Sequence, residues 1–262
     1  MIAASVPPRE VAIPVGRVTL PGTLTLPATP RGIVLFAHGS GSSRHSPRNR
    51  FVADVLVDAG VAALLFDLLT PPEDRIREAR FDIPLLTTRL AGATAWLATE
   101  PALSALPVGY FGASTGAAAA LDAAAVSGSG VRAVVSRGGR PDLAGANALA
   151  RVTAPTLLLV GGEDREVIEL NRAAKEHMRC DCELAIVPGA THLFEEPGTL
   201  EAVAVAARDW FVRQFAGNQG LTLLPASAAW GADPTSASGS GPESPWRPTR
   251  AAARRPRRPR PA

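Results

Sequence analysis

The sequence VGYFGASTGAAAALDAAAV, residues 108–126, decides which fold the rest of the chain is expected to adopt. An apolar run ends at Phe111, a G-x-S-x-G motif occupies 112–116, and an Ala-rich run continues from Ser114. A strand that turns sharply into a helix in this way presents the Ser114 hydroxyl above a sheet, as a nucleophile elbow. The motif alone is weak, because it also occurs by chance in a chain with 24 Gly, so its context has to support it. A plain Gly-rich turn is the alternative interpretation.

The segments on either side alternate between strand-like and helix-like patterns. Strands are expected at 10–15 and 17–26, as a hairpin, and at 33–37, 61–66, 108–111, 131–136, 155–160 and 182–187. Helices are expected at 47–59, 82–99, 114–126, 167–178 and 197–215. Short apolar strands that alternate with helices indicate a mostly parallel sheet with helices on both faces. The chain is therefore predicted to be an α/β protein with a sheet of about seven or eight strands.

Charge divides the chain into a nearly neutral domain, 1–216, and a basic tail, 217–262. The whole chain has 27 basic and 24 acidic residues, a net charge of +3. The tail holds seven arginines and two acids, which leaves 20 basic and 22 acidic residues in the domain. Because the tail is rich in Pro and Arg without apolar periodicity, it is predicted to be disordered. Nucleic-acid binding is not expected, apart from weak electrostatic contact through this tail.

Several protein classes do not fit the sequence. No apolar run reaches the roughly 18 residues of a membrane-spanning helix, and the N-terminus, MIAASVPPREVAIPVG, does not resemble a secretory signal. The run GSGSSR at 39–44 lacks the third glycine of a dinucleotide-binding turn. The two cysteines, Cys180 and Cys182, can form no disulfide framework, and two thiolates alone make a poor zinc site. These features favour a reduced, cytoplasmic protein.

A candidate general base is found by elimination among four histidines. His192 follows the last expected strand, at the carboxyl edge of the sheet where a base must lie to reach Ser114. His38 ends a buried strand and is expected to bond backbone groups, while His177 falls in a helix and His45 in a long loop. A loop histidine without a catalytic role is the alternative interpretation for His192.

A candidate orienting acid lies in the run GGED at 161–164, directly after the expected strand 155–160. Asp164 there can accept the second imidazole N–H and stabilise the imidazolium that forms when Ser114 gives up its proton. Glu163 is the competing acid, and the run is also a good turn and helix cap. The chain order of Ser114, Asp164 and His192, each after a different strand, is that of the α/β-hydrolase triad.

A tetrahedral oxyanion needs two backbone N–H donors close to the nucleophile. One is expected from Thr115, the residue that follows Ser114. The other is expected from the loop after the strand 33–37, where Ser40 in the run HGSG is the candidate.

The runs FAHGSGSS, GASTG, VGGED and GATHLFEEPG together resemble the α/β-hydrolase superfamily, and within it the branch related to dienelactone hydrolases. The resemblance covers residues 10–216. It implies hydrolysis of an ester or lactone through an acyl-enzyme, without a metal or an organic cofactor. Dienelactone hydrolases use a Cys nucleophile, so Ser114 favours a general carboxylesterase. Proteins of this kind also occur fused to phosphoribosyltransferase-like domains, and no such pattern lies in these 262 residues.

Arginines near the expected site suggest a substrate with an acidic group. Arg44 and Arg48 lie in the loop after the oxyanion segment, and Arg137 follows the strand 131–136. Guanidinium groups bind carboxylates and phosphates well. The alternative is that these arginines order loops by pairing with nearby acids, namely Asp67, Glu73 or Asp142.

Other functions remain open at this stage. The expected partner is a small-molecule ester, with no membrane partner, and the oligomeric state is left undetermined. A non-catalytic hydrolase-like binding module is the alternative from another class. Acyl transfer and peptide hydrolysis use the same triad, because fold and triad do not fix the acceptor.

Overall fold

The computed structural model describes residues 7–126 and 128–216, so the predicted tail lies outside the described residues. Its eight strands are β1 (Arg9–Val15), β2 (Val18–Thr25), β3 (Ile33–Ala37), β4 (Ala62–Phe66), β5 (Val108–Ala113), β6 (Val131–Arg137), β7 (Thr156–Gly161) and β8 (Cys182–Val187). They form one sheet in the order β1-β2-β4-β3-β5-β6-β7-β8. β1 and β2 pair antiparallel, β2 pairs antiparallel with β4, and every pair from β4 to β8 is parallel. The predicted α/β class is confirmed.

Five helices of ten or more residues connect these strands, namely α1 (Pro47–Asp58), α3 (Ile83–Leu97), α4 (Thr115–Ala124), α6 (Arg165–His177) and α7 (Thr199–Phe215). Each lies close to an expected helix. Four short elements were not predicted, namely α2 (Pro71–Asp74), η1 (Glu78–Phe81), η2 (Pro141–Ala144) and α5 (Ala146–Leu149). No helix in residues 7–126 and 128–216 is both long and apolar enough to cross a membrane.

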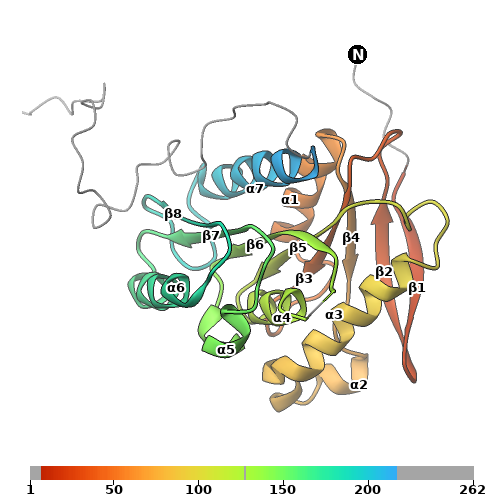
Figure 1. The fold of residues 1–262 in the computed structure, drawn as a ribbon, viewed down its shortest axis with the longest axis horizontal. Coiled ribbons are helices and arrows are strands. Elements are labelled where there is room, and N and C mark those ends of the chain that lie inside the picture. The colour runs from red at the N-terminus through yellow and green to blue at the C-terminus, as the bar shows by residue number, and fades with distance from the viewer. Residues whose placement is uncertain (1–6, 127, 217–262) are drawn as a thin grey trace, which may run out of the picture.

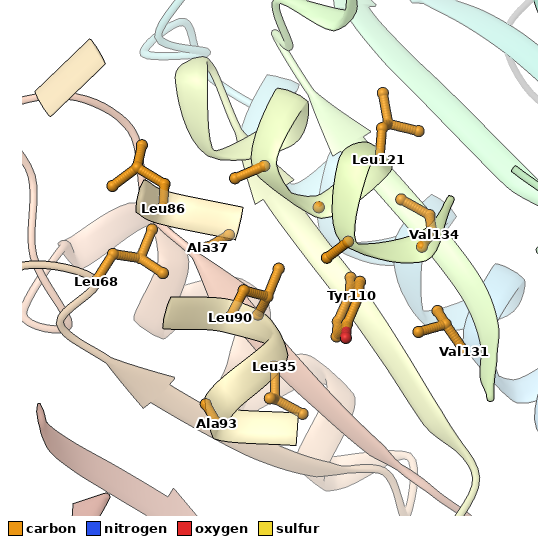
Figure 2. Close-up of a cluster of buried hydrophobic side chains, with 14 of the residues drawn as sticks. Leu35, Ala37, Leu68, Leu86, Leu90, Ala93, Tyr110, Leu121, Val131 and Val134 are labelled. Carbon is orange, nitrogen blue, oxygen red and sulfur yellow. The ribbon is translucent and has the colours of Figure 1, made fainter. Parts of the chain in front are cut away.

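Helices cover both faces of the sheet, which explains why its central strands are apolar throughout. α1 and α7 lie on one face, and α3, α4, α5 and α6 lie on the other (Figure 1). Successive residues of a strand point to opposite faces. Leu35 of β3 accordingly packs among the residues of the α3–α4 face, and Phe36 packs with Phe111 and Trp210 on the α1–α7 face. Figure 2 shows the first of these clusters, where Tyr110 and Leu35 lie near Leu90 of α3.

The turn from β5 into α4 brings helix backbone unusually close to the strands. A Cβ atom at Gly112 would lie 2.4 Å from the Cα atom of Ala117, and one at Gly116 would lie 2.2 Å from the carbonyl oxygen of Ala37. Both distances are far inside van der Waals contact, so no side chain fits at either position. The two glycines of the G-x-S-x-G motif are therefore required by packing.

Gly116→Ala is expected to lower the free energy of unfolding by about 1–3 kcal/mol or more, as overpacked cores do. An exposed helix position would instead gain up to about 1 kcal/mol from the same change. Urea unfolding monitored by circular dichroism measures the difference. Gly22→Ala in β2 is the control, because the nearest atoms to its Cβ are side-chain atoms of Ile13, Val11 and Phe66 at 3.1–3.2 Å, with no backbone overlap, so its loss should be smaller. A Gly116→Ala protein as stable as the wild type would contradict the packing argument.

Candidate active site

Ser114 sits on the strained turn that the motif predicts. Its backbone angles are φ 50° and ψ −121°, and Phe194 is the other non-glycine residue with positive φ among the described residues. Such conformations cost about 1–3 kcal/mol and persist where the surroundings impose them. Here the Ser114 N–H donates to the carbonyl of Arg137 at 3.2 Å, and the Arg140 N–H donates to the carbonyl of Ser114 at 3.1 Å. The end of β6 and the segment after it thus hold the serine in place.

His192 and Asp164 are joined by a hydrogen bond of 2.6 Å between Nδ1 and Oδ2. Asp164 follows β7 at the N-cap position of α6, without a side-chain capping bond, while His192 lies in the turn after β8. The two turns can approach because Gly161 packs against the chain, where a Cβ would lie 2.4 Å from the carbonyl oxygen of Ala190. Glu163 is exposed and makes no bond to His192, so Asp164 is the acid placed on the histidine. Donation from Nδ1 leaves Nε2 with a free lone pair.

The segment after β6 connects the histidine to the elbow. A Cβ at Gly138 would lie 3.6 Å from Cε1 of His192 and 3.1 Å from its carbonyl oxygen. Gly138 directly follows Arg137, whose carbonyl accepts from the Ser114 N–H. No hydrogen bond joins the Ser114 hydroxyl to the His192 ring within the described part of the chain. Catalytic hydrogen bonds are often longer without substrate and shorten when it binds.

The oxyanion candidates lie against each other. The Ser40 N–H donates to the Thr115 hydroxyl oxygen at 2.9 Å, so this expected donor already has a partner in the free protein. The loop also packs on the nucleophile, since a Cβ at Gly39 would lie 3.1 Å from Cβ of Ser114. Thr115, the first residue of α4, is buried.

None of the other three histidines is hydrogen-bonded to Ser114, Asp164 or His192 among the described residues. His38 is buried, its Nδ1 lies 3.0 Å from the carbonyl of Gly39, and its Nε2 accepts from the Leu68 N–H at 3.0 Å. The predicted backbone role of His38 is confirmed. Burial, the main cause, lowers the pKa of His38 below its ordinary value of 6.5. His45 and His177 are exposed.

The three arginines singled out in the sequence have different surroundings. Arg44 pairs with Asp67 and, at 3.5 Å, with Glu10, which matches the loop-ordering alternative. Arg48 pairs with Glu195 at 3.1 Å. Glu73 and Asp142 were also expected to pair with one of these three arginines, and that prediction was wrong. Glu73 pairs with Arg89, and Asp142 pairs with Arg140.

Arg137 is a buried cation without an acidic partner among the described residues. Its Nε and Nη1 atoms make no hydrogen bond, and its guanidinium lies 5.8 Å from the centre of the Phe194 ring. Burial, with a smaller contribution from the nearby Arg48, lowers the pKa of Arg137 to about 10. Phe194 lies in the same turn as His192, so Arg137 packs against the segment that carries the proposed base. Over residues 7–126 and 128–216, no three His, Cys, Asp or Glu side chains form a group that could hold a metal ion.

No family model matches the sequence. A Mycobacterium tuberculosis protein that is provisionally named a phosphoribosyl transferase is 62% identical over 218 residues, which are 82% of this chain and 49% of that protein. The chain thus spans about half the length of the curated relatives it matches.

Solved structures match over nearly their whole length. The crystal structure of a dienelactone hydrolase from Anabaena variabilis is 57% identical, covers 79% of this chain and 98% of its own, and has a TM-score of 0.77. A dienelactone hydrolase-like promiscuous phosphotriesterase from metagenomic libraries is 20% identical, covers 80% of this chain and 99% of its own, and has a TM-score of 0.66. At that identity the second match supports the fold alone.

His38 is expected to make stability depend on pH. Because its pKa is lowered in the folded state, the unfolded chain binds a proton that the folded chain does not. Burial of neutral His38 therefore adds to the free energy of unfolding fully at pH values above its ordinary pKa of 6.5. This stabilisation is lost as the pH falls below 6.5, because the unfolded chain then takes up the proton. Urea unfolding across this range should show a flatter pH dependence for His38→Gln than for the wild type. The exposed His45→Gln is the control, and an unchanged slope in His38→Gln would refute the assignment.

Proposed function

The chain belongs to the dienelactone hydrolase family of α/β-hydrolases, and from that membership we propose that it is a serine hydrolase that cleaves a carboxylic ester or lactone. The observation that carries the proposal is the hydrogen bond between His192 and Asp164 beside the strained turn at Ser114. We assign Ser114 as the nucleophile, His192 as the general base and Asp164 as the residue that orients the imidazole.

The reaction follows from these roles. Ser114 Oγ attacks the ester carbonyl while His192 Nε2 takes the hydroxyl proton, which gives a tetrahedral oxyanion and an imidazolium beside Asp164. The carbon–oxygen bond to the alcohol breaks, and His192 returns its proton to the leaving alkoxide. Water then attacks the acyl-enzyme with His192 again as base, and the carboxylic acid and free Ser114 are regenerated. No step needs a metal or an organic cofactor.

The oxyanion is assigned to the N–H groups of Thr115 and Ser40. Because the Thr115 hydroxyl accepts from the Ser40 N–H at 2.9 Å, it keeps that donor beside the elbow before substrate arrives. In the proposed mechanism the Ser40 N–H exchanges this partner for the oxyanion when the tetrahedral intermediate forms. Removing one oxyanion donor costs about 2.7–4 kcal/mol of transition-state stabilisation in a serine hydrolase.

Phosphoribosyl transfer is not proposed. That name attaches to proteins of which this chain spans about half, and the nucleophile, base and acid proposed here are those of acyl transfer. Transfer of the acyl group to another acceptor uses the same residues, and competition between water and added alcohols in the assay separates the two reactions.

Turnover of p-nitrophenyl acetate tests the proposal. Ser114→Ala is expected to lower kcat by about 10⁶-fold, because it removes the nucleophile. Asp164→Asn is expected to lower kcat by about 10⁴-fold, because it favours the wrong imidazole tautomer. Glu163→Gln is the matched control, because this neighbouring acid is exposed and not bonded to His192, and it should retain wild-type turnover. Hydrolysis that survives intact in Ser114→Ala would exclude this serine as the nucleophile.

Substitution of Thr115 tests the oxyanion assignment. Thr115→Val removes the acceptor that holds the Ser40 N–H, so kcat should fall by about 10²-fold, close to the loss of one donor. Thr115→Ser keeps the hydroxyl and should retain most of the activity. A Thr115→Val enzyme faster than the wild type would mean instead that the hydroxyl blocks the oxyanion site.

A further inference from the structure

An open pocket of about 300 Å³ lies beside the oxyanion loop. It is lined by Ser40, Gly41, Arg75, Arg77, Arg80 and Phe81. The first two residues belong to the loop that packs on Ser114, and the other four come from the connection between β4 and α3. The pocket therefore starts next to the proposed reaction centre and extends away from it, toward α2 and η1.

Arg80 is held in a fixed orientation in this pocket. Its Nε donates to the carbonyl oxygen of Asp74 at 2.7 Å and to Oδ1 at 3.0 Å, and its Nη2 donates to Oδ2 at 3.2 Å. Nη1 has no hydrogen-bond partner in the described part of the chain and lies toward the oxyanion loop, 3.8 Å from the position of a Cβ on Gly41. One guanidinium edge is thus occupied by the protein, while a donor on the other side is available to a ligand.

The pocket carries positive charge that the described residues do not neutralise. Asp74 compensates Arg80, but Arg75 and Arg77 are exposed and have no ion pair within residues 7–126 and 128–216. No acidic side chain is among the six lining residues. Arg44 and Arg48 are less available to a ligand, because their guanidinium groups already pair with the carboxylates of Asp67 and Glu195. Two guanidinium groups that line this pocket, those of Arg75 and Arg77, therefore have no ion-pair partner among the described residues.

The wall of the pocket also has an apolar part. Phe81 is 48% exposed, and its ring lies 5.9 Å from the Arg77 guanidinium, which helps to orient that arginine. The neighbouring Ile76 is 53% exposed. Of these two side chains, Phe81 lines the pocket and gives its wall an apolar surface. The arrangement suits a molecule with an apolar body and a strongly anionic end.

We propose that this pocket binds a phosphate group, so that the preferred substrates are esters that carry a phosphate monoester on the acyl or the alcohol part. The inference rests on the proposed ester hydrolysis and names its substrate class. A phosphate monoester has a charge of about −1.5 to −2 at neutral pH and three acceptor oxygens. These match two uncompensated charges and three guanidinium groups, whereas a carboxylate has one charge and is satisfied by one guanidinium.

Three matched substrates test the preference. They are phenyl acetates with a phosphonomethyl, a carboxymethyl or a hydroxymethyl group in the para position, assayed at low ionic strength because exposed arginines are screened by salt. The kcat/KM for the phosphonate should exceed that for the neutral ester by about tenfold or more, mainly through KM. The carboxylate should gain much less. A carboxylate preferred equally would overturn the assignment to phosphate, and no preference for either anion would overturn the anion site.

Variants locate the effect. In the double variant Arg75→Gln/Arg77→Gln, kcat/KM for the phosphonate ester divided by kcat/KM for the neutral ester should fall to near one. Arg132→Gln, an exposed arginine at the opposite end of β6 from the site, is the matched control and should keep the ratio. Loss of the ratio in both proteins would indicate a general charge effect and contradict a site in this pocket.

A binding measurement separates this inference from the proposed function. Calorimetric titration with phenylphosphonate should show binding to the wild type and to Arg132→Gln, and binding at least about tenfold weaker to Arg75→Gln/Arg77→Gln. If the neutral ester is hydrolysed without phosphonate preference, ester hydrolysis stands and the subsite fails. If no ester is hydrolysed but phenylphosphonate binds through these arginines, the subsite stands and the proposed reaction fails. Absence of binding in the wild type overturns the subsite.

Discussion

The contact between Gly116 and the backbone at Ala37 is the constraint on which the rest of the site depends. It allows α4 to start directly against β3, with no side chain between helix and strand. The chain can reach that position from β5 only through a sharp turn, which forces Ser114 into positive φ. The same approach brings Thr115 against the loop after β3, where its hydroxyl accepts from the Ser40 N–H. One packing contact thus sets the nucleophile and both proposed oxyanion donors.

The sequence predicted the regular elements and the polar residues at their ends, for a common physical reason. Strands buried on both faces must be apolar throughout, so the runs around Leu35, Tyr110 and Leu158 stand out without any knowledge of their neighbours. Residues just after such strands meet at one edge of the sheet, which is why Asp164 and His192 could be singled out before their hydrogen bond was known. The local sequence pattern was enough to predict these two residues, because the ends of the parallel strands define the sheet edge at which they meet.

Ion pairs and short helices could not be predicted in the same way. The partner of Arg48 is Glu195, 147 residues away, and nothing in the local sequence identifies it. α2 and η1 are four residues each, too short to show a helical apolar period. Their arginines were therefore missed, although the run DRIREAR at 74–80 holds three of them in six positions and could have been noticed as a basic cluster. Which arginines are neutralised is decided only by tertiary contacts.

The central claim is that Ser114 is an activated nucleophile, and a covalent label tests it most directly. A fluorophosphonate probe is incubated with the wild type and with Ser114→Ala, and the site of modification is mapped by peptide mass spectrometry. The account predicts one adduct per chain, on Ser114, and none in Ser114→Ala. A folded wild-type protein that takes up no label, or a label on another residue that persists in Ser114→Ala, would contradict it.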